Sequence, residues 1–256
     1  MMPGNLFRLE LAAAFADRRR IVLRVSVSVL LGLPFILVDM PPNVKAAGIV
    51  MVILFTSFFG AAVGHAKLRA DLRFDRLALL PTRRALLWLD LILASALARL
   101  GPTSIVLAGF LLINGQSLTA RAVVVLFGLF CSSVVLLTLL GIGIGRIARN
   151  NGEVHLFGAL AAGILACISG VTPLPRRLSW LAATMAWNPV ARLHAMLTKL
   201  ATGSIAVGLT ELTFVSLMLG GIAVIVVLRW ISGGAFKTKG VDARDIVVDN
   251  GAPLEA

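Results

Sequence analysis

The stretch AVVVLFGLFCSSVVLLTLLGIGIG, residues 122–145, carries no charged side chain and exceeds the roughly 20 apolar residues that cross a bilayer as a helix. Similar apolar stretches lie on both sides of it, and charged clusters separate them. The 256-residue chain is 59% hydrophobic and only 14% charged, whereas a soluble domain is about a quarter charged. The sequence therefore predicts an all-α membrane protein.

Six apolar stretches are long enough to predict transmembrane helices, which makes the expected fold polytopic. We place these spans at residues 21–38, 46–64, 86–113, 122–145, 154–171 and 205–228. Gly101-Pro102 is expected to break the third span and Pro102 to kink it, because proline lacks a backbone donor and clashes with the preceding helical turn.

Three regions follow from this pattern. Residues 1–20 predict an amphipathic interfacial helix, since Leu11 and Phe15 can share an apolar face while Arg18 and Arg19 point elsewhere. A plain cytoplasmic extension of the first span is the alternative. The six-helix transmembrane domain then covers residues 21–231, and residues 232–256 predict a polar cytoplasmic tail.

The distribution of basic residues predicts the orientation. The chain has a net charge of +12, and its Lys and Arg residues gather beside the apolar stretches. With both termini in the cytoplasm, inner segments hold 17 of these residues and outer segments hold 6. This asymmetry follows the positive-inside rule and predicts a multi-pass protein of the bacterial inner membrane that touches anionic lipids. Zinc-ligand spacing and basic aromatic sheet patterns are lacking, so we expect no nucleic-acid partner.

Two pairs of glycines, Gly60/Gly64 and Gly141/Gly145, are each four residues apart in predicted spans. This spacing lets two helices approach closely. The sequence leaves open whether the close approach occurs within one chain or between two copies.

The sequence contains no P-loop, no paired carboxylates at metal-ligand spacing and no catalytic constellation. We therefore expect no enzyme activity, metal or cofactor on this chain. Two charged residues are candidate intramembrane polar sites, Arg99 and Glu211. Arg99 can line a substrate path, form a salt bridge or snorkel at the helix break. Glu211 can lie within the last span or at its surface end.

The inner loop, residues 65–84, interleaves charges of both signs with apolar side chains. A loop lying on lipid headgroups would be mostly basic, so the mixed signs favour a short helix presented to a cytoplasmic partner. Its candidate contact residues are Arg69, Asp71, Leu72, Phe74, Asp75 and Arg76.

Together these motifs resemble those of ABC-2-type permeases, the membrane subunits of many bacterial ABC exporters. After the charged loop helix comes L-x-x-L-P-x-x-R at residues 77–84. A small-residue element at Ser169-Gly170 follows the fifth apolar stretch, and the outer segment after it carries Pro173, Pro175, Trp180 and Asn188-Pro189. One position departs from the family pattern, since Asp90 stands where members often have lysine.

The resemblance implies an assembly of two permease subunits, alike or paralogous, with two separate ATPase subunits that bind ATP and Mg. In such a transporter the segment from Arg69 to Arg76 would be the coupling helix that docks on the ATPase. The outer segment would form short re-entrant helices before the last span, with Gly170, Pro173, Pro175, Asn188 and Pro189 as its marker residues.

The expected function is therefore ATP-driven export of a hydrophobic or amphipathic substrate, such as a drug, a peptide or a lipid-like molecule. One alternative is an ion- or proton-coupled secondary carrier that uses Arg99 and Glu211. The lack of inverted repeats and of several intramembrane acids disfavours it. Another alternative is a non-transporting membrane scaffold or immunity protein, which would bind a partner without ATP-linked flux.

Overall fold

The computed structural model describes residues 6–16, 18–70, 84–114, 118–172, 179–203 and 208–234. Every regular element in these ranges is a helix, which confirms the predicted all-α class for the described part of the chain. The helices are α1 (Leu6–Ala16), α2 (Arg18–Leu37), α3 (Pro42–Leu54), η2 (Phe55–Phe59, a π-helical turn), α4 (Gly60–Ala70), α6 (Arg84–Asn114), α7 (Ala120–Ile147), α8 (Asn151–Ile168), α9 (Ser179–Trp187), α10 (Pro189–Ala201) and α11 (Leu209–Gly234).

Local capping chemistry sets the starts of several helices. The Thr119 hydroxyl accepts a hydrogen bond from the Ala122 amide at 3.2 Å and begins α7. The Asn150 side chain accepts from the Glu153 amide at 2.8 Å and begins α8, while the Glu153 carboxylate accepts from the Arg149 amide at 2.7 Å. This reciprocal arrangement resembles a capping box and fixes the turn between α7 and α8.

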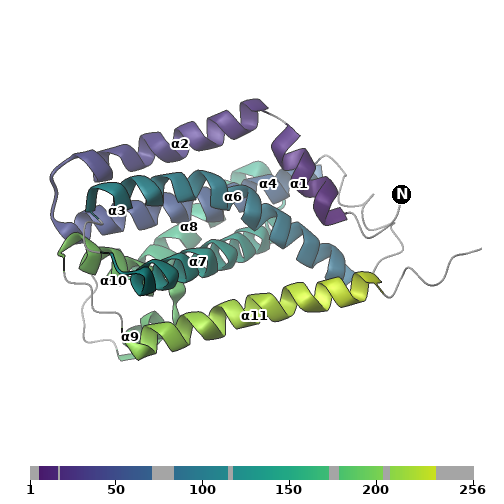
Figure 1. Cartoon of the computed structure of the whole chain (residues 1–256). Coiled ribbons are helices and arrows are strands. Elements are labelled where there is room, and N and C mark those ends of the chain that lie inside the picture. Colours follow the sequence, from purple (N-terminus) through teal and green to yellow (C-terminus); the bar gives the residue numbers. More distant parts are fainter. Residues whose placement is uncertain are drawn as a thin grey trace, which may run out of the picture.

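The long helices run side by side, and α7 lies among them (Figure 1). It contacts α4, η2, α6, α8, α10 and α11. Phe130 and Leu137 of α7 are fully buried in the apolar core that these neighbours form. One end of the bundle carries α1 and the C-terminal end of α11, and the other carries α9 and α10. We call them the α1 end and the α10 end.

Three helices are long and apolar enough to cross a membrane: Pro42–Ala70, Leu87–Asn114 and Ala120–Ile147. The bent pair Glu10–Ala16 and Ile21–Leu37, which meets at 75°, makes a fourth if it is counted as one span. The apolar stretches Gly152–Ile168 and Leu209–Ile225 are shorter. In the part of the chain that the structure describes, all regular elements are thus helical, with three or four candidate spans of the six predicted.

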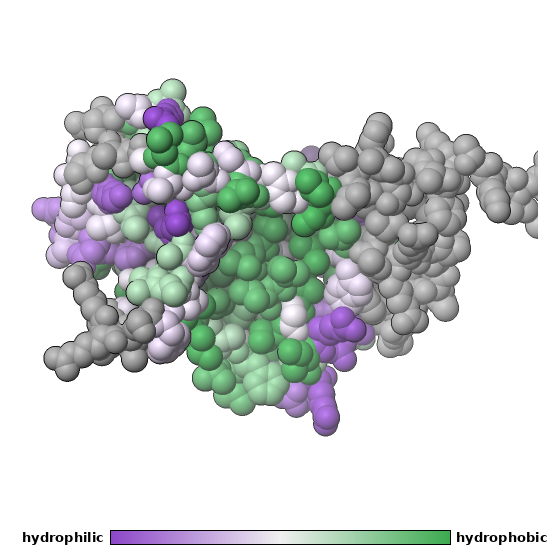
Figure 2. Space-filling model, turned by 90° about the horizontal axis from the view of Figure 1, so that it is seen from below, coloured by the Kyte–Doolittle hydropathy of each residue, from purple (hydrophilic) through white to green (hydrophobic). Residues whose placement is uncertain are grey.

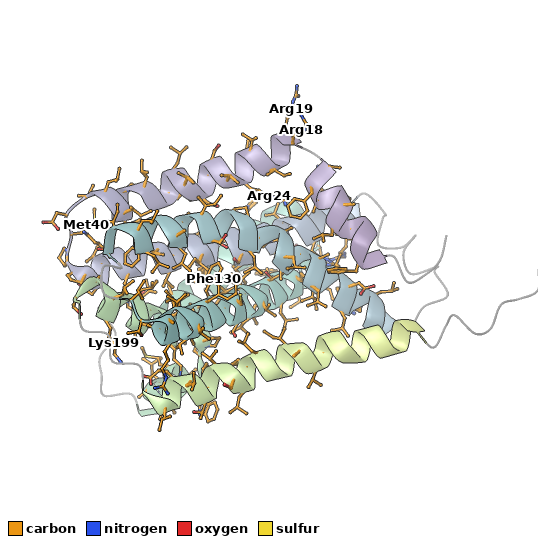
Figure 3. The ribbon with its side chains drawn as sticks, viewed as in Figure 1. Arg18, Arg19, Arg24, Met40, Phe130 and Lys199 are labelled. Carbon is orange, nitrogen blue, oxygen red and sulfur yellow. The ribbon has the colours of Figure 1, made fainter. Side chains whose placement is uncertain are left out.

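The outer surface of the bundle is apolar over a broad band. Leu112, Phe127 and Leu160 are each more than half exposed, the most extreme being Leu112 at 83%. Figure 2 shows a hydrophobic band across the middle of one face, with hydrophilic residues to its left and at its lower right. Arg18 and Arg19 lie at the α1 end and Lys199 at the α10 end, with Phe130 between them (Figure 3). This arrangement matches the bilayer as the surrounding solvent.

The helix is not interrupted at Gly101-Pro102 as predicted, because α6 continues from Arg84 to Asn114 with Pro102 inside it, whereas the kink expected at Pro102 stays a prediction. Proline deprives the ladder of only one donor, and neighbouring helices can hold such a segment in place. Both Pro102 and Thr103 are buried, and the Thr103 hydroxyl donates to the Arg99 carbonyl at 2.7 Å. Tertiary packing therefore outweighs the local cost of the proline.

The glycine pairs pack within one chain. A Cβ added at Gly141 would collide with the Phe58 carbonyl oxygen, and one at Gly145 would lie 2.5 Å from the Ala62 oxygen. These two glycines let α7 approach the backbone of η2 and α4 directly. Of the two possibilities that the sequence left open, the structure shows the close approach within a single chain at Gly141/Gly145.

Candidate functional site

Arg99 is the most unusual charged residue of the described bundle. It lies in the candidate span Leu87–Asn114, and only 8% of the residue is exposed. Its Nη1 donates to the Ser95 carbonyl at 2.6 Å and also contacts the Ser95 hydroxyl. The buried Nε has no hydrogen-bond partner within the described residues. A guanidinium in this position is costly unless it faces protein or water.

Two glycines of α4 make room for this guanidinium. A Cβ added at Gly60 would lie 3.4 Å from the Arg99 Nε, and one at Gly64 would lie 3.5 Å from its Nη2. The arginine therefore lies directly against the backbone face of α4. The spacing of Gly60 and Gly64, which predicts close helix approach, here accommodates a buried side chain of α6.

A cavity of about 370 Å³ opens beside Arg99. Its walls come from α1, α2, α4 and α6, with Ile142 contributed by α7. Small side chains create the space, among them Ala13 and Ala14 of α1 and Ala94 and Ala98 of α6. A volume of this size lies within the range of small-molecule sites.

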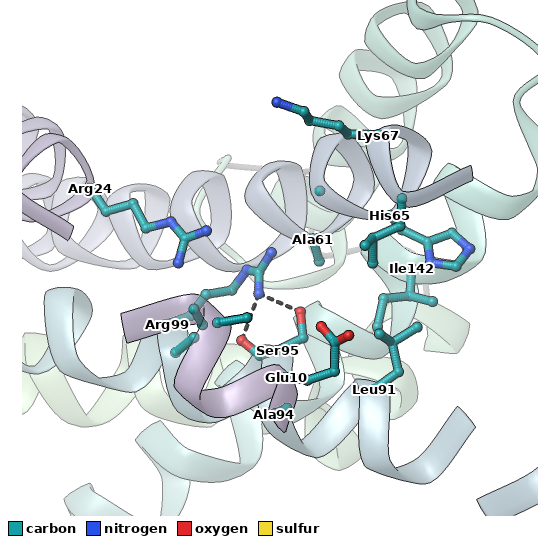
Figure 4. Close-up of a pocket in the computed structure, with 15 residues that line it drawn as sticks. Glu10, Arg24, Ala61, His65, Lys67, Leu91, Ala94, Ser95, Arg99 and Ile142 are labelled. Atoms are coloured by element: carbon teal, nitrogen blue, oxygen red, sulfur yellow. Dashed lines mark hydrogen bonds between the residues drawn. The ribbon is translucent and has the colours of Figure 1, made fainter. Parts of the chain in front are cut away.

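The charges around the cavity are unbalanced. Arg24, Lys67 and Arg99 line it together with the carboxylate of Glu10 and the ring of His65. Figure 4 shows the guanidinium groups of Arg24 and Arg99 approaching each other, with Glu10 on the Ser95 side of the cavity. Even with Glu10 counted against one cation, the described lining keeps an excess of positive charge.

At the α1 end, Arg69 ties α4 to the end of α7. Its Nη1 donates to the carbonyl oxygens of Arg146 at 2.7 Å, Ala148 at 2.9 Å and Gly145 at 3.4 Å. These carbonyls lie at the C-terminal end of α7, where the helix dipole favours a cation. The side chain of Arg69 thus points toward the bundle.

A stacked group extends this connection to α6. The Arg146 guanidinium lies 4.9 Å from the centre of the Trp88 ring, and the His65 ring lies 5.4 Å from the same indole. Cation–π contacts of this kind favour a fixed geometry when they are partly desolvated. The α1 ends of α4, α6 and α7 are therefore linked through Arg69, Arg146 and Trp88.

Of the candidate coupling residues, the structure describes Arg69 alone. Asp71, Leu72, Phe74, Asp75 and Arg76 lie outside the described residues, as does most of the L-x-x-L-P-x-x-R motif. The C-terminal tail from residue 235 also lies outside them. Asp90, the residue that departs from the family pattern, is only 2% exposed in α6.

At the α10 end, the two motifs of the outer segment meet. The Asn188 side chain donates to the Ile168 carbonyl at 3.2 Å and to the Ser169 hydroxyl at 3.3 Å. Its oxygen accepts from the Val190 amide at 3.0 Å and so begins α10, with Pro189 at the first helical position. Asn188 thus connects the end of α8 to the start of α10.

Gly170 terminates α8 with a left-handed backbone, at φ +68°. A side chain there would also collide with the methyl group of Met185 in α9. Pro173 and Pro175 lie outside the described residues. Burial lowers the pKa of His194 in α10, although a backbone hydrogen bond with Asn43 acts in the opposite direction.

Glu211 lies in the first turn of α11, at the α10 end of the bundle. Its carboxylate is 3.8 Å from the Lys199 ammonium of α10 and accepts from the Thr210 hydroxyl at 3.0 Å. The structure does not bring it together with Arg99. Of the two candidate intramembrane residues, only Arg99 is buried within a candidate span.

The side chains described above can bind a ligand or hold helices in position. Within the described residues, no group of His, Cys, Asp and Glu side chains could hold a metal ion. Comparison with protein-family models found no match to this chain, and comparison with curated proteins found no similar sequence. The resemblance to ABC-2-type permeases therefore remains a prediction from the sequence motifs.

Sequence reasoning identified Arg99 but missed the cavity around it. The signal was present as Gly60 and Gly64 in one apolar stretch and alanines flanking Arg99 in another. Small residues predict close helix packing in membranes. Only the paired helices show that they also leave space for a guanidinium and a cavity.

Proposed function

We propose that this chain is the permease subunit of an ATP-driven exporter. It would act with a second permease copy or a paralogue and with two ATPase subunits, which bind ATP and Mg. Both termini would lie in the cytoplasm. The substrate would be hydrophobic or amphipathic and would be moved out of the cell.

The observation that carries this proposal is the bonding of Arg69 to the end of α7. Arg69 is the first residue of the segment proposed to dock on an ATPase, and its side chain joins three carbonyl groups of α7 and the following turn. A displacement of that segment would therefore pull on α7, the helix that contacts α4, η2, α6, α8, α10 and α11. Rigid-body transmission of this kind suits packed helices.

The proposal includes six spans. Helices α8 and α11 lie lengthwise beside α7 (Figure 1), and we assign them as the fifth and sixth spans. The described apolar stretch of each, Gly152–Ile168 and Leu209–Ile225, approaches the roughly 20 residues that a span requires. The short helices α9 and α10 between them suit the outer re-entrant segment of the family pattern.

Purification of the tagged chain from its native membranes in mild detergent tests the proposed assembly. We expect an ATPase chain with a P-loop to co-purify and to be identified by mass spectrometry. Repeated purification without any ATPase would contradict the exporter proposal. It would favour the secondary carrier, if a gradient drives transport, or the scaffold, if no transport occurs.

Variants of the reconstituted complex test the coupling route. We expect Arg69→Gln to retain the ATPase subunits but to lower the permease-dependent stimulation of ATP hydrolysis about tenfold, because charge-assisted hydrogen bonds to α7 are lost. Arg149→Gln is the matched control, since it removes an exposed cation near the same end of the bundle. If Arg69→Gln left the stimulation of ATP hydrolysis unchanged, coupling through Arg69 would be contradicted.

A further inference from the structure

We propose that the cavity between α1, α2, α4 and α6 binds the phosphate group of an anionic amphiphile. The site consists of Arg99 as the principal ligand, with Arg24 as an additional cation. This inference concerns ligand binding alone and does not depend on the exporter proposal.

The first argument is the unsatisfied bonding capacity of Arg99. Its Nη1 is used on Ser95, whereas the buried Nε lacks a hydrogen-bond partner in the described structure. A guanidinium presents donors in a planar fork that matches the oxygens of a phosphate group. Buried polar groups without partners are rare in native proteins and call for an explanation. The Nε itself is covered by α4 near Gly60, so a bound phosphate group would be held by the terminal nitrogens of the guanidinium, which lines the cavity.

The second argument is charge. Burying a cation without a counter-charge is strongly unfavourable, and here Arg24 approaches Arg99 across the same cavity (Figure 4). Glu10 also faces the cavity, and it can offset at most one of these two cations; Lys67 lines the cavity as well but is exposed. A phosphate group carrying one or two negative charges would reduce the remaining repulsion.

The third argument is shape and location. The cavity of about 370 Å³ holds more than a phosphate group, and alanines form much of its wall. Helix α1 forms one side and meets α2 at a bend of 75°, next to the basic residues Arg18 and Arg19. A bend between an amphipathic helix and a span is expected at the level of lipid headgroups. The ligand would thus place its phosphate beside Arg99 and its chains along the apolar helices.

Native mass spectrometry of the delipidated full-length chain in detergent tests the site. The probes are dioleoyl phosphatidic acid, dioleoyl phosphatidylcholine and inorganic phosphate. We expect wild type to bind phosphatidic acid at least about tenfold more tightly than phosphatidylcholine, and Arg99→Gln to lose that preference, since charged hydrogen bonds are typically worth a factor of about ten or more.

The controls make each outcome decisive. Arg149→Gln removes an exposed cation elsewhere and should keep the preference. Arg24→Gln should weaken phosphatidic acid binding severalfold, and it serves as the test if Arg99→Gln does not elute as a folded protein. Displacement of phosphatidic acid by inorganic phosphate would support the site and identify a free anion as a competing ligand. Equal binding of both lipids, or a folded Arg99→Gln or Arg24→Gln with unchanged preference, would overturn the proposal.

Discussion

Glycines have opposite roles where α7 packs against η2 and α4 and where α6 packs against α4. On the face toward α7, Gly141 and Gly145 bring backbone against backbone, and no space remains for even one methyl group. On the face toward α6, Gly60 and Gly64 lie against the guanidinium of Arg99, and a cavity opens beside them. The first face follows the usual rule of close packing. The second departs from it around a buried charge, which is typical of a functional site rather than of a structural contact.

The largest effect on stability is expected from adding a methyl group where α7 packs closely against η2 and α4. Gly141→Ala would place its methyl group into the Phe58 carbonyl and 2.8 Å from the Ala61 Cβ, so helices must separate. We expect a loss of about 3 kcal/mol of stability, the upper end for overpacking, measured as a lower thermal midpoint in detergent. Gly143→Ala in the same helix is the control, since nothing lies within 4 Å of an added Cβ there. Equal midpoints for the two variants would contradict the close contact of α7 with η2.

A smaller change in stability, of opposite sign, is expected beside the cavity between α4 and α6. Arg99→Met keeps an unbranched, flexible side chain and removes a buried cation whose Nε has no partner within the described residues. We expect stability to stay constant or to rise by about 1 kcal/mol, because a buried charge is often replaced by an apolar side chain without loss. Thermal unfolding and phosphatidic acid binding should be measured on the same sample. Binding should fall while the midpoint does not, and a large drop in the midpoint would show Arg99 to be a structural residue.

The smallest effect is expected at Gly64. An added Cβ would lie 3.5 Å from the Arg99 Nη2, which is an ordinary contact distance. Gly64→Ala should therefore raise stability by about 0.5 kcal/mol through its better helix propensity. Gly145→Ala, on the α7 face, should instead lower the thermal midpoint, because its Cβ would lie 2.5 Å from a backbone oxygen. If the two variants shifted the midpoint alike, the contrast between the two faces would be wrong.

Much of the helical framework could be predicted from local composition. The predicted spans at residues 46–64, 86–113 and 122–145 overlap the observed Pro42–Ala70, Leu87–Asn114 and Ala120–Ile147. Apolar length is a property of contiguous residues, so one sequence suffices to detect it. The same local reasoning was wrong in expecting an interruption at Gly101-Pro102, because the packing that holds α6 together comes from other helices.

Asn188 and Arg69 likewise separate what the sequence predicts from what only the packing of the helices shows. Asn188 was singled out from its motif, but its bonds to Ile168 and Ser169 join residues about twenty positions apart. Arg69 was expected to face a partner, whereas its side chain bonds to carbonyl groups at the end of α7. Contacts between distant segments depend on which helix faces meet, and composition does not specify that.

The sequence by itself determined that this protein is helical and apolar, and that its charges gather at the ends of the apolar stretches, because hydrocarbon excludes unpaired polar backbone and favours helices. Only the tertiary structure decided which glycines meet backbone and which meet Arg99. Helix pairing sets those distances, and at Arg99 it places a buried guanidinium at the edge of a cavity whose described charged residues are mostly cations.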